Sequence, residues 1–339
     1  SFDPIADPLL LQGRDAQLKT LDGVLNRWQA QQPSSAVVVT GPMGGGATSF
    51  LRVAAGTLLT GLPVHRVDLI ERLADPDRLA LALAEAFEID LSQDEDTSLS
   101  RLGRLERHLL AGPDAPRRVC LLEHLEHLML RTGGGLAPLE TVLTFLSRTD
   151  HRVLWLATMN ESAWRFVART APALTGLVTP LPLPSLDRAA LEALILKRHA
   201  RSGLPLTFDE PQAPAPLLVR RLKGANNDAT RQDLLRADYF DRLARASGRS
   251  IALALFYWLR SLDFESADDH LTVRSLPPLD FGFLAGYDLP RAFALKALLQ
   301  HGTLTLSEYQ RVFRSTPREG YLLFESLANE LLITRANGT

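Results

Sequence analysis

A glycine-rich segment directly after a short apolar strand restricts the fold of this chain more than any other feature. The segment GPMGGGATSF covers residues 41–50 and follows AVVVT at residues 36–40. Gly41, Gly46 and Thr48 have the spacing of a phosphate-binding loop, G-x-x-x-x-G-K-[ST], but Ala47 replaces its lysine. A glycine turn from a strand into a helix gathers backbone N–H groups at one point, where the helix dipole also favours anions.

Two interpretations of this loop stay open. In the first, Gly44, Gly45 and Gly46 cradle a phosphate and lead into the hydroxyls of Thr48 and Ser49. The missing lysine then removes a charge-assisted hydrogen bond of about 1.5–3 kcal/mol, and it weakens stabilisation of a phosphoryl-transfer transition state even more. In the second interpretation, the glycines serve only the geometry of a strand-to-helix turn.

Strands and helices alternate along the first half of the chain. The apolar strand-like segments are residues 36–40, 63–69, 117–123 and 151–160. Segments with helical periodicity separate them, and this alternation predicts an α/β fold with a parallel sheet covered by helices on both faces. We expect Asp75 to cap a helix that starts at Pro76, and Ser185 to cap a helix that stops at Gly203.

Composition excludes several classes of protein. The net charge of -2 over 339 residues gives no overall attraction to nucleic acid or anionic membranes. The best apolar run, residues 251–259, is half the length of about 18 residues that a membrane-spanning helix needs. The single cysteine, Cys120, fits a reducing compartment and a cytoplasmic location, and its apolar neighbours predict a buried, unreactive thiol.

Polar side chains end two of the predicted strands. Glu123 ends the strand RRVCLLE, and Thr158 and Asn160 end the strand HRVLWLATMN. Open α/β sheets bind their ligands at the carboxyl ends of the strands. Glu123 therefore stands where a carboxylate would hold Mg²⁺, and Asn160 where a side chain would orient a water against a γ-phosphate.

The order of these pieces resembles an AAA+ ATPase of the origin-recognition and STAND-like branch. GPMGGGATS is similar to its Walker A motif, VCLLEH to its Walker B motif, and LATMN to its sensor 1. Residues 181–204 resemble the entry into its helical lid, residues 239–262 its sensor 2 region, and residues 295–335 its winged helix. The resemblance covers nearly the whole chain.

The resemblance implies a P-loop core at residues 1–184, a helical lid at 185–270 and a winged helix at 271–339. It implies ATP or ADP as ligand, with Mg²⁺ held by Thr48 and Glu123. The ligand-binding residues implied are Gly41, Gly44, Gly45, Gly46, Ala47, Thr48, Ser49 and Arg249, and the catalytic positions are Glu123, His124 and Asn160.

Several residues depart from the family pattern. Ala47 replaces the Walker A lysine, Glu123 stands in place of aspartate, and His124 replaces the glutamate that polarises the attacking water. Arg249 follows its glycine by one residue, where the sensor arginine usually comes a little later. We therefore expect a degenerate module that binds nucleotide with weak or no hydrolysis, acting as a switch or assembly component with a protein partner or further copies of itself.

Two other functions stay open as alternatives. In the first, the chain is a nucleotide-free structural or adaptor protein of AAA+ shape. In the second, it is a DNA-binding regulator that acts through its winged helix. The second depends on Arg311, Arg314 and Arg318 of the winged-helix region, but three glutamates in the same region make it less basic than phosphate contacts normally require.

Three further groups have both a structural and a functional interpretation. Glu126 could substitute for the missing catalytic carboxylate. The sequence EHLEH at residues 123–127 could hold a metal, but it has no cysteine pair and no H-E-x-x-H spacing. Arg165 and Arg169 could complete a neighbouring subunit's site, or they form an exposed basic helix face.

Overall fold

The computed structural model describes residues 4–73, 75–92, 98–111, 117–263, 270–276 and 281–335. The chain divides into two compact units, each assembled from separate stretches of sequence. Unit 1 comprises Ser1–Gln32, Val39–Leu62 and Leu181–Leu279, and unit 2 comprises Pro33–Val38, Pro63–Pro180 and Asp280–Thr339. The three-part domain division expected from the sequence stays a prediction.

A five-stranded sheet confirms the predicted α/β architecture. Its strand order is β2-β3-β4-β1-β5. The strands are β1 (Val37–Gly41), β2 (Val64–Asp68), β3 (Arg118–Glu123), β4 (Val153–Asn160) and β5 (Thr179–Pro182). The pairs β2–β3 and β3–β4 are parallel, with Asp68 opposite Glu123. Strand β1 is buried along its whole length, as its run of valines favours.

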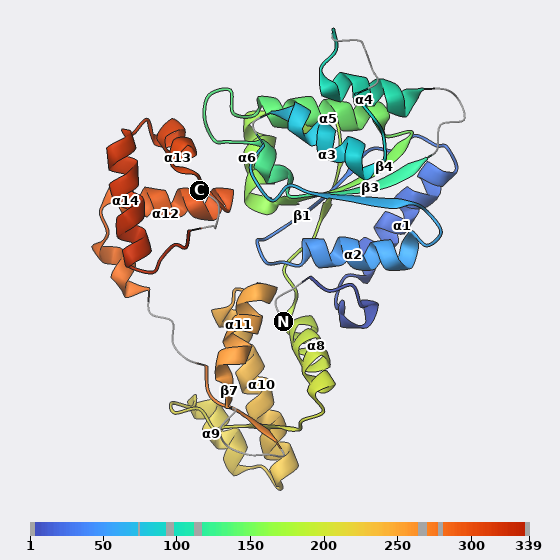
Figure 1. The fold of residues 1–339 in the computed structure, drawn as a ribbon. Coiled ribbons are helices and arrows are strands. Elements are labelled where there is room, and N and C mark those ends of the chain that lie inside the picture. The colour runs from blue at the N-terminus through green and yellow to red at the C-terminus, as the bar shows by residue number, and fades with distance from the viewer. Residues whose placement is uncertain are drawn as a thin grey trace. The chain divides into compact units, whose positions relative to one another are not determined.

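Helices of unit 2 pack on β3 and β4 through an apolar core. These helices are α3 (Pro76–Ala86), α4 (Arg101–Leu110) and α5 (Ala137–Thr149), which lie together over one face of these strands (Figure 1). Helices α6 (Glu161–Thr170) and α7 (Pro172–Thr175) follow β4, and the 3-10 helix η2 (Leu125–Leu128) follows β3.

Trp155 of β4 is the aromatic centre of this core. It is fully buried, its ring lies 5.6 Å from that of Phe145, and its indole N–H donates to Thr149 Oγ1 at 3.0 Å. Such a ring pair adds about 0.5–1.5 kcal/mol beyond the area that it buries. Cys120 lies in the same core, where burial raises the pKa of its thiol, so the predicted structural role of this cysteine is confirmed.

The predicted helix starts are half right. Asp75 caps α3, because its Oδ1 accepts from the Asp77 N–H at 2.9 Å. Ser185 is not a cap: α8 begins at Arg188, and Asp187 accepts from the Ala190 N–H at 2.7 Å. The backbone is still extended at Asp187, with ψ 171°, so the helix starts two residues later than the serine predicts.

Unit 1 combines an N-terminal segment, the glycine loop and a mostly helical region that we call the lid, residues 185–263. The first two contain η1 (Pro8–Leu10), α1 (Asp15–Gln29) and α2 (Ala47–Leu58). The lid contains α8 (Arg188–His199), η3 (Ala200–Ser202), α9 (Pro216–Lys223), α10 (Asp228–Ala246) and α11 (Ile251–Ser261). Within the described chain, no helix is long and apolar enough to cross a membrane.

A small sheet that the sequence did not predict pairs two lid strands with a strand that follows the lid. Its strands β6 (Leu206–Phe208), β8 (Leu271–Val273) and β7 (Leu262–Asp263) lie in that order. Phe208 of β6 packs against Tyr239 and Phe240 of α10, and Trp258 of α11 stacks on Phe240 at 5.9 Å. This aromatic cluster joins the sheet to α10 and α11.

Residues 281–335 are helical as far as the structure describes them. They form η4 (Gly282–Gly286), α12 (Leu289–His301), α13 (Leu306–Phe313) and α14 (Pro317–Asn329), which lie together in Figure 1. Capping boxes start two of these helices, with Thr305 and Glu308 at α13 and Thr316 and Glu319 at α14. The helical part of the expected winged helix is therefore confirmed.

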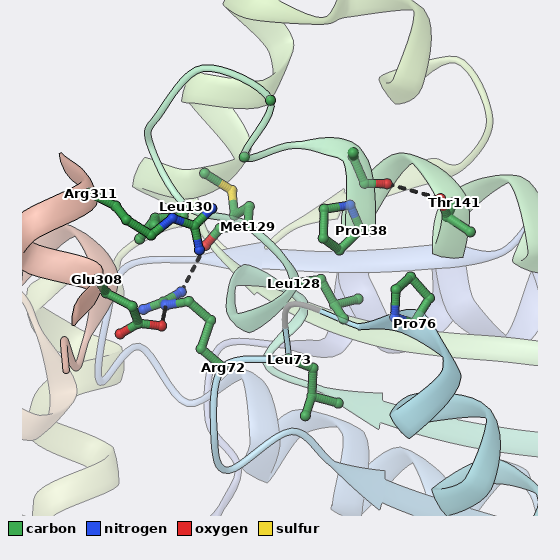
Figure 2. Close-up of a pocket in the computed structure, with 13 residues that line it drawn as sticks. Arg72, Leu73, Pro76, Leu128, Met129, Leu130, Pro138, Thr141, Glu308 and Arg311 are labelled. Carbon is green, nitrogen blue, oxygen red and sulfur yellow. Dashed lines mark hydrogen bonds and ion pairs between the residues drawn. The ribbon is translucent and has the colours of Figure 1, made fainter.

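Arg72 ties α12 and α13 to the rest of unit 2. Its guanidinium donates to four backbone carbonyls at 2.8–3.1 Å, and its Nε lies 2.9 Å from Glu308 Oε1. The four carbonyls belong to Glu126, Met129, His301 and Thr303. Figure 2 shows the Arg72–Glu308 pair beside a cavity of about 300 Å³ that Leu73, Leu128 and Pro138 also line.

Arg72→Met is expected to destabilise unit 2 by about 3–5 kcal/mol, because it removes one partner of a nearly buried ion pair and strands several carbonyls. Denaturant unfolding measures the loss, and hydrogen exchange should show faster exchange in α12 and α13. Arg165→Met is the control: Arg165 pairs with Glu161 on the surface at 2.9 Å, and such pairs contribute about 0–1 kcal/mol. Equal effects of the two substitutions would contradict the role of Arg72.

His301 is a buried neutral histidine at the same junction. Its Nδ1 bonds to the Ala297 carbonyl at 2.9 Å, and its Nε2 accepts from the Arg131 N–H at 3.2 Å. Because a carbonyl can only accept and an N–H can only donate, the ring is neutral with its proton on Nδ1. Burial lowers the pKa of His301, and the charges of Arg72 and Arg131 lower it further. The hydrogen bond to the Ala297 carbonyl and the charge of Glu308 raise it, but by less.

This lowered pKa makes the stability of unit 2 fall in mild acid. The unfolded chain takes up a proton at His301 near pH 6.5, as an ordinary histidine does, whereas the folded protein resists it until a lower pH. Between these two pKa values the free energy of unfolding should decrease by up to about 1.4 kcal/mol per pH unit.

His301→Gln should flatten part of this pH dependence, and His127, whose pKa burial also lowers, should supply the remainder. Chemical denaturation from pH 7.5 to pH 5 measures the slope. His151→Gln, at an exposed position, serves as the control. A slope that H301Q leaves unchanged would show that His301 does not titrate on unfolding.

Candidate functional site

The glycine loop of unit 1 has the geometry of a strand-to-helix anion cradle. Gly44 and Gly46 have positive φ angles of 69° and 87°, and α2 begins directly at Ala47. The Gly45 N–H donates to the Pro42 carbonyl at 2.8 Å, and a Cβ added at Gly45 would lie 2.7 Å from that oxygen. The first turn of α2 carries no acidic side chain that would compete with an anion.

The lid helix α11 begins against this loop. The Ala252 N–H donates to the Gly44 carbonyl at 3.1 Å, and a Cβ added at Gly44 would lie only 2.5 Å from Ala252 Cβ. A Cβ at Gly46 would touch Ile251 at 3.5 Å. Arg249 precedes Ala252 by three residues, is exposed, and has a left-handed backbone with φ 63°. The start of α11, which follows Arg249, thus lies at the glycine loop. The resemblance to AAA+ proteins implies the sensor arginine in this region.

Arg14 lies behind the loop and was missed by the sequence reasoning. Its side chain is buried, with 3% exposed, and it donates to the Gly45 carbonyl at 3.2 Å and to the Pro184 carbonyl at 2.6 Å. Burial lowers its pKa. Among the described residues no carboxylate lies within 4.0 Å of its guanidinium. Its sequence signal is only an arginine after Gly13 in the turn that opens α1.

The hydroxyl residues of the loop have different surroundings. Ser49 Oγ accepts from the Ile5 N–H at 3.1 Å, so this hydroxyl is already used to hold the N-terminal segment. Thr48 and Ala47 lie half-buried in the first turn of α2. The loop therefore offers Thr48 as its freer hydroxyl.

Unit 2 brings Glu123 and His124 together with Asp68. Glu123 ends β3 and is completely buried, and Arg66 Nε lies 2.7 Å from its Oε1. The backbone of His124 is left-handed, with φ 66°, and its N–H donates to Thr158 Oγ1 at 2.9 Å. His124 Nδ1 lies 2.8 Å from Asp68 Oδ1. The sequence reasoning did not connect Asp68 with this site, since 56 residues separate it from His124.

Asn160 and Glu126 hold the end of β4. Asn160 Oδ1 caps α6 by accepting from the Ala163 N–H at 2.7 Å, so only its amide N–H₂ group remains to contact a phosphate. Glu126 lies in η2, and its Oε2 accepts from the Asn160 N–H at 3.2 Å. This oxygen of the Glu126 carboxylate holds the backbone at the end of β4, and a catalytic role for Glu126 stays a prediction.

The EHLEH segment does not gather its four polar side chains around one point. His127 is buried and bonds through Nδ1 to the Leu69 carbonyl, and burial lowers its pKa. Among the described residues, the group whose ligand atoms all lie within 4.8 Å of one another is Asp68, Glu123 and His124. Arg165 pairs with Glu161 on the surface at 2.9 Å. This pair agrees with the interpretation of Arg165 as part of an exposed helix face.

Comparison with solved structures identifies the architecture. The ORC2 protein of Aeropyrum pernix, solved in ADPNP and ADP complexes, matches with a TM-score of 0.54 at 14% identity, covering 99% of this chain and 90% of that one. The chain has the AAA+ fold. The Aeropyrum pernix ORC1 protein in complex with DNA matches at 19% identity, with TM-score 0.47 and coverages of 95% and 84%.

Cdc6p from Pyrobaculum aerophilum gives 16% identity and a TM-score of 0.48, over 100% of this chain and 91% of that one. No protein-family model matches the chain, and no curated protein matches its sequence. The comparison with ORC2 therefore supports the AAA+ fold, and the roles of individual residues depend on the geometry described above.

Gly44→Ala is expected to destabilise unit 1 by about 1–3 kcal/mol, because the new Cβ overlaps Ala252 in a packed contact and φ is positive. Gly61→Ala is the matched control, since Gly61 also has a positive φ, 82°, with nothing within 4 Å of an added Cβ. Thermal unfolding of both variants separates the overlap from the backbone strain.

Ala252→Gly in the Gly44→Ala background removes the second Cβ of the overlapping pair. In a double-mutant cycle with the two single variants G44A and A252G, we expect the pair to recover the stability that G44A loses beyond G61A. If G44A and G61A lose the same stability, Gly44 is required only for its backbone conformation.

Proposed function

We propose that this chain binds a nucleoside di- or triphosphate at the loop Gly41–Ser49 and hydrolyses it slowly or not at all. The observation that carries the proposal is the buried guanidinium of Arg14 against the same loop, where it donates to the backbone carbonyls of Gly45 and Pro184. A buried cation without a nearby anion is unfavourable, and a phosphate bound at the adjoining helix N-terminus would offset its charge.

The residues of the loop fit the phosphate groups of a nucleotide. Gly44 and Gly45 leave no room for a Cβ, Gly46 has a positive φ that favours glycine, and the N-terminus of α2 directs backbone N–H groups towards one point. Thr48 supplies a hydroxyl in the first turn. The ADPNP and ADP complexes of the ORC2 protein, which shares the fold, are consistent with this assignment.

Hydrolysis lacks its usual groups. Ala47 provides no charge for the β- and γ-phosphates, although fixed positive groups are the main source of transition-state stabilisation in phosphoryl transfer. His124 is directed to Asp68, and the Glu126 carboxylate binds the Asn160 N–H. In this proposal the bound nucleotide acts mainly as a structural signal.

A divalent cation supplies charge neutralisation at the phosphates when it is bound with a nucleotide. Thr48 and Glu123 stay the predicted Mg²⁺ ligands. Glu123 is fully buried, and neither oxygen of its carboxylate has a hydrogen-bond partner in the described chain.

The contact between Gly44 and Ala252 is the proposed link from nucleotide to lid. The loop that would bind phosphate is hydrogen-bonded through Gly44 to the start of α11. A ligand that shifts the loop backbone must shift the start of α11 or break this bond. The protein partner or further copies of the chain that would read the lid, and DNA binding by α12–α14, stay predictions.

Isothermal titration with ATP, ADP and Mg²⁺ tests the proposal, and thermal shift provides a second readout. We expect the wild-type chain to bind weakly and Ala47→Lys to bind roughly 10-fold to 150-fold more tightly, because one charge-assisted hydrogen bond contributes about 1.5–3 kcal/mol. Arg14→Met should bind less tightly than wild type.

Ala137→Lys is the matched control, because Ala137 is the first residue of α5 and therefore has the same place in a different helix. It should leave nucleotide affinity unchanged. Failure of both the wild type and A47K to bind millimolar nucleotide would contradict the proposal and favour a nucleotide-free adaptor.

A further inference from the structure

Two carboxylates and an imidazole meet where β2 and β3 end. Asp68 and Glu123 are paired residues of neighbouring parallel strands, so their side chains project from the same face of the sheet. His124 follows Glu123 directly. One potential ligand atom from each of the three residues lies within 4.8 Å of the other two, and all three residues belong to unit 2.

The Glu123 carboxylate is buried and lacks hydrogen-bond partners among the described residues. The residue is 0% exposed, and neither carboxylate oxygen has a hydrogen-bond partner in the described part of the chain. Arg66 Nε lies 2.7 Å from Oε1, but the geometry of this ion pair is not that of a hydrogen bond, and it leaves Oε2 without a partner. A buried ionised carboxylate needs further compensation.

His124 and Asp68 supply the other two donors. His124 Nδ1 lies 2.8 Å from Asp68 Oδ1, and both side chains are partly exposed, so ions reach them from solvent. Ligand atoms around a four-coordinate metal lie roughly 3.3 Å apart, given metal–ligand bonds of about 2.0–2.1 Å. Small side-chain rotations therefore open the present hydrogen bond enough to admit a metal ion.

We propose that Asp68, Glu123 and His124 bind a divalent first-row transition metal, with Zn²⁺ as the best match. One imidazole nitrogen and two carboxylate oxygens are ligands that Zn²⁺ accepts, whereas Mg²⁺ takes oxygen ligands and usually keeps several waters. Three protein ligands leave a fourth position for water or another small ligand. The site shares Glu123 with the predicted Mg²⁺ ligands, but it needs neither Thr48 nor a nucleotide, so it can be tested without the proposed function.

When no metal is bound, the guanidinium of Arg66 is the cation beside these carboxylates. Its guanidinium lies 2.7 Å from Glu123 Oε1 and 3.7 Å from Asp68 Oδ2, between the two carboxylates. A metal ion and this guanidinium would repel each other at such distances. Removing the charge of Arg66 should therefore strengthen metal binding, whereas a purely structural ion-pair network would only be weakened.

Titration of the chelator-treated, nucleotide-free chain with Zn²⁺, followed by calorimetry, tests the proposal, and the visible spectrum of bound Co²⁺ reports its ligands. We expect one equivalent to bind. Asp68→Asn and His124→Ala should each weaken binding at least about tenfold, and Arg66→Gln should strengthen it about tenfold. Circular dichroism without metal checks that each variant is folded.

Two controls separate this site from its alternatives. Glu126→Gln should leave Zn²⁺ binding unchanged, which excludes a ligand set made of the EHLEH residues. Thr48→Ala should also leave it unchanged, which excludes a cation site that depends on the glycine loop.

Zn²⁺ and Co²⁺ binding that is absent, or that persists undiminished in the D68N/H124A double variant, would overturn the proposal. Since Asp68 is at the surface, its variant should fold even if a change at His124 does not, and D68N alone then decides the outcome.

Discussion

A backbone hydrogen bond from Ala252 to Gly44 joins the glycine loop to the lid, and much of unit 1 depends on it. The bond requires the two backbones to approach so closely that no Cβ fits at Gly44. The same approach places the start of α11, and the arginine before it, at the loop. A glycine that looks like part of a phosphate motif is thus also a packing requirement of the lid. The packing role of Gly44 is compatible with the proposed binding of phosphate by the same loop.

Local sequence patterns predicted the elements of the core well. Runs of valine and leucine identified β1, β3 and β4 because buried parallel strands are apolar on both faces. Asp75 was recognisable as a cap because a proline follows it at the first helical position. Ser185 failed because a nearer carboxylate, Asp187, takes the same role while the chain is still extended. The small lid sheet was missed because its strands have only two or three residues.

Pairs of residues far apart in the sequence could not be predicted in this way. Arg14 contacts Gly45 across 31 positions, and Asp68 reaches His124 across 56. No periodicity or spacing rule relates such residues, since only the tertiary fold brings them together. The motif residues were therefore placed on the right elements, whereas the charges that surround them came only from the structure. These charges define two chemically distinct places, the glycine loop with Arg14 and the group of Asp68, Glu123 and His124.

The partners of Arg72 have a consequence for the order in which the protein is made. Two of its carbonyl acceptors lie 229 and 231 residues further along the chain. During synthesis, the strands and helices around Arg72 leave the ribosome long before α12 and α13 exist. Domains that emerge early generally fold early, but the Arg72 guanidinium cannot gain these two acceptors until His301 and Thr303 have been made. Unit 2 therefore completes its fold only after α12 and α13 have emerged, and a chain that stalls before them leaves this guanidinium without two of its backbone partners.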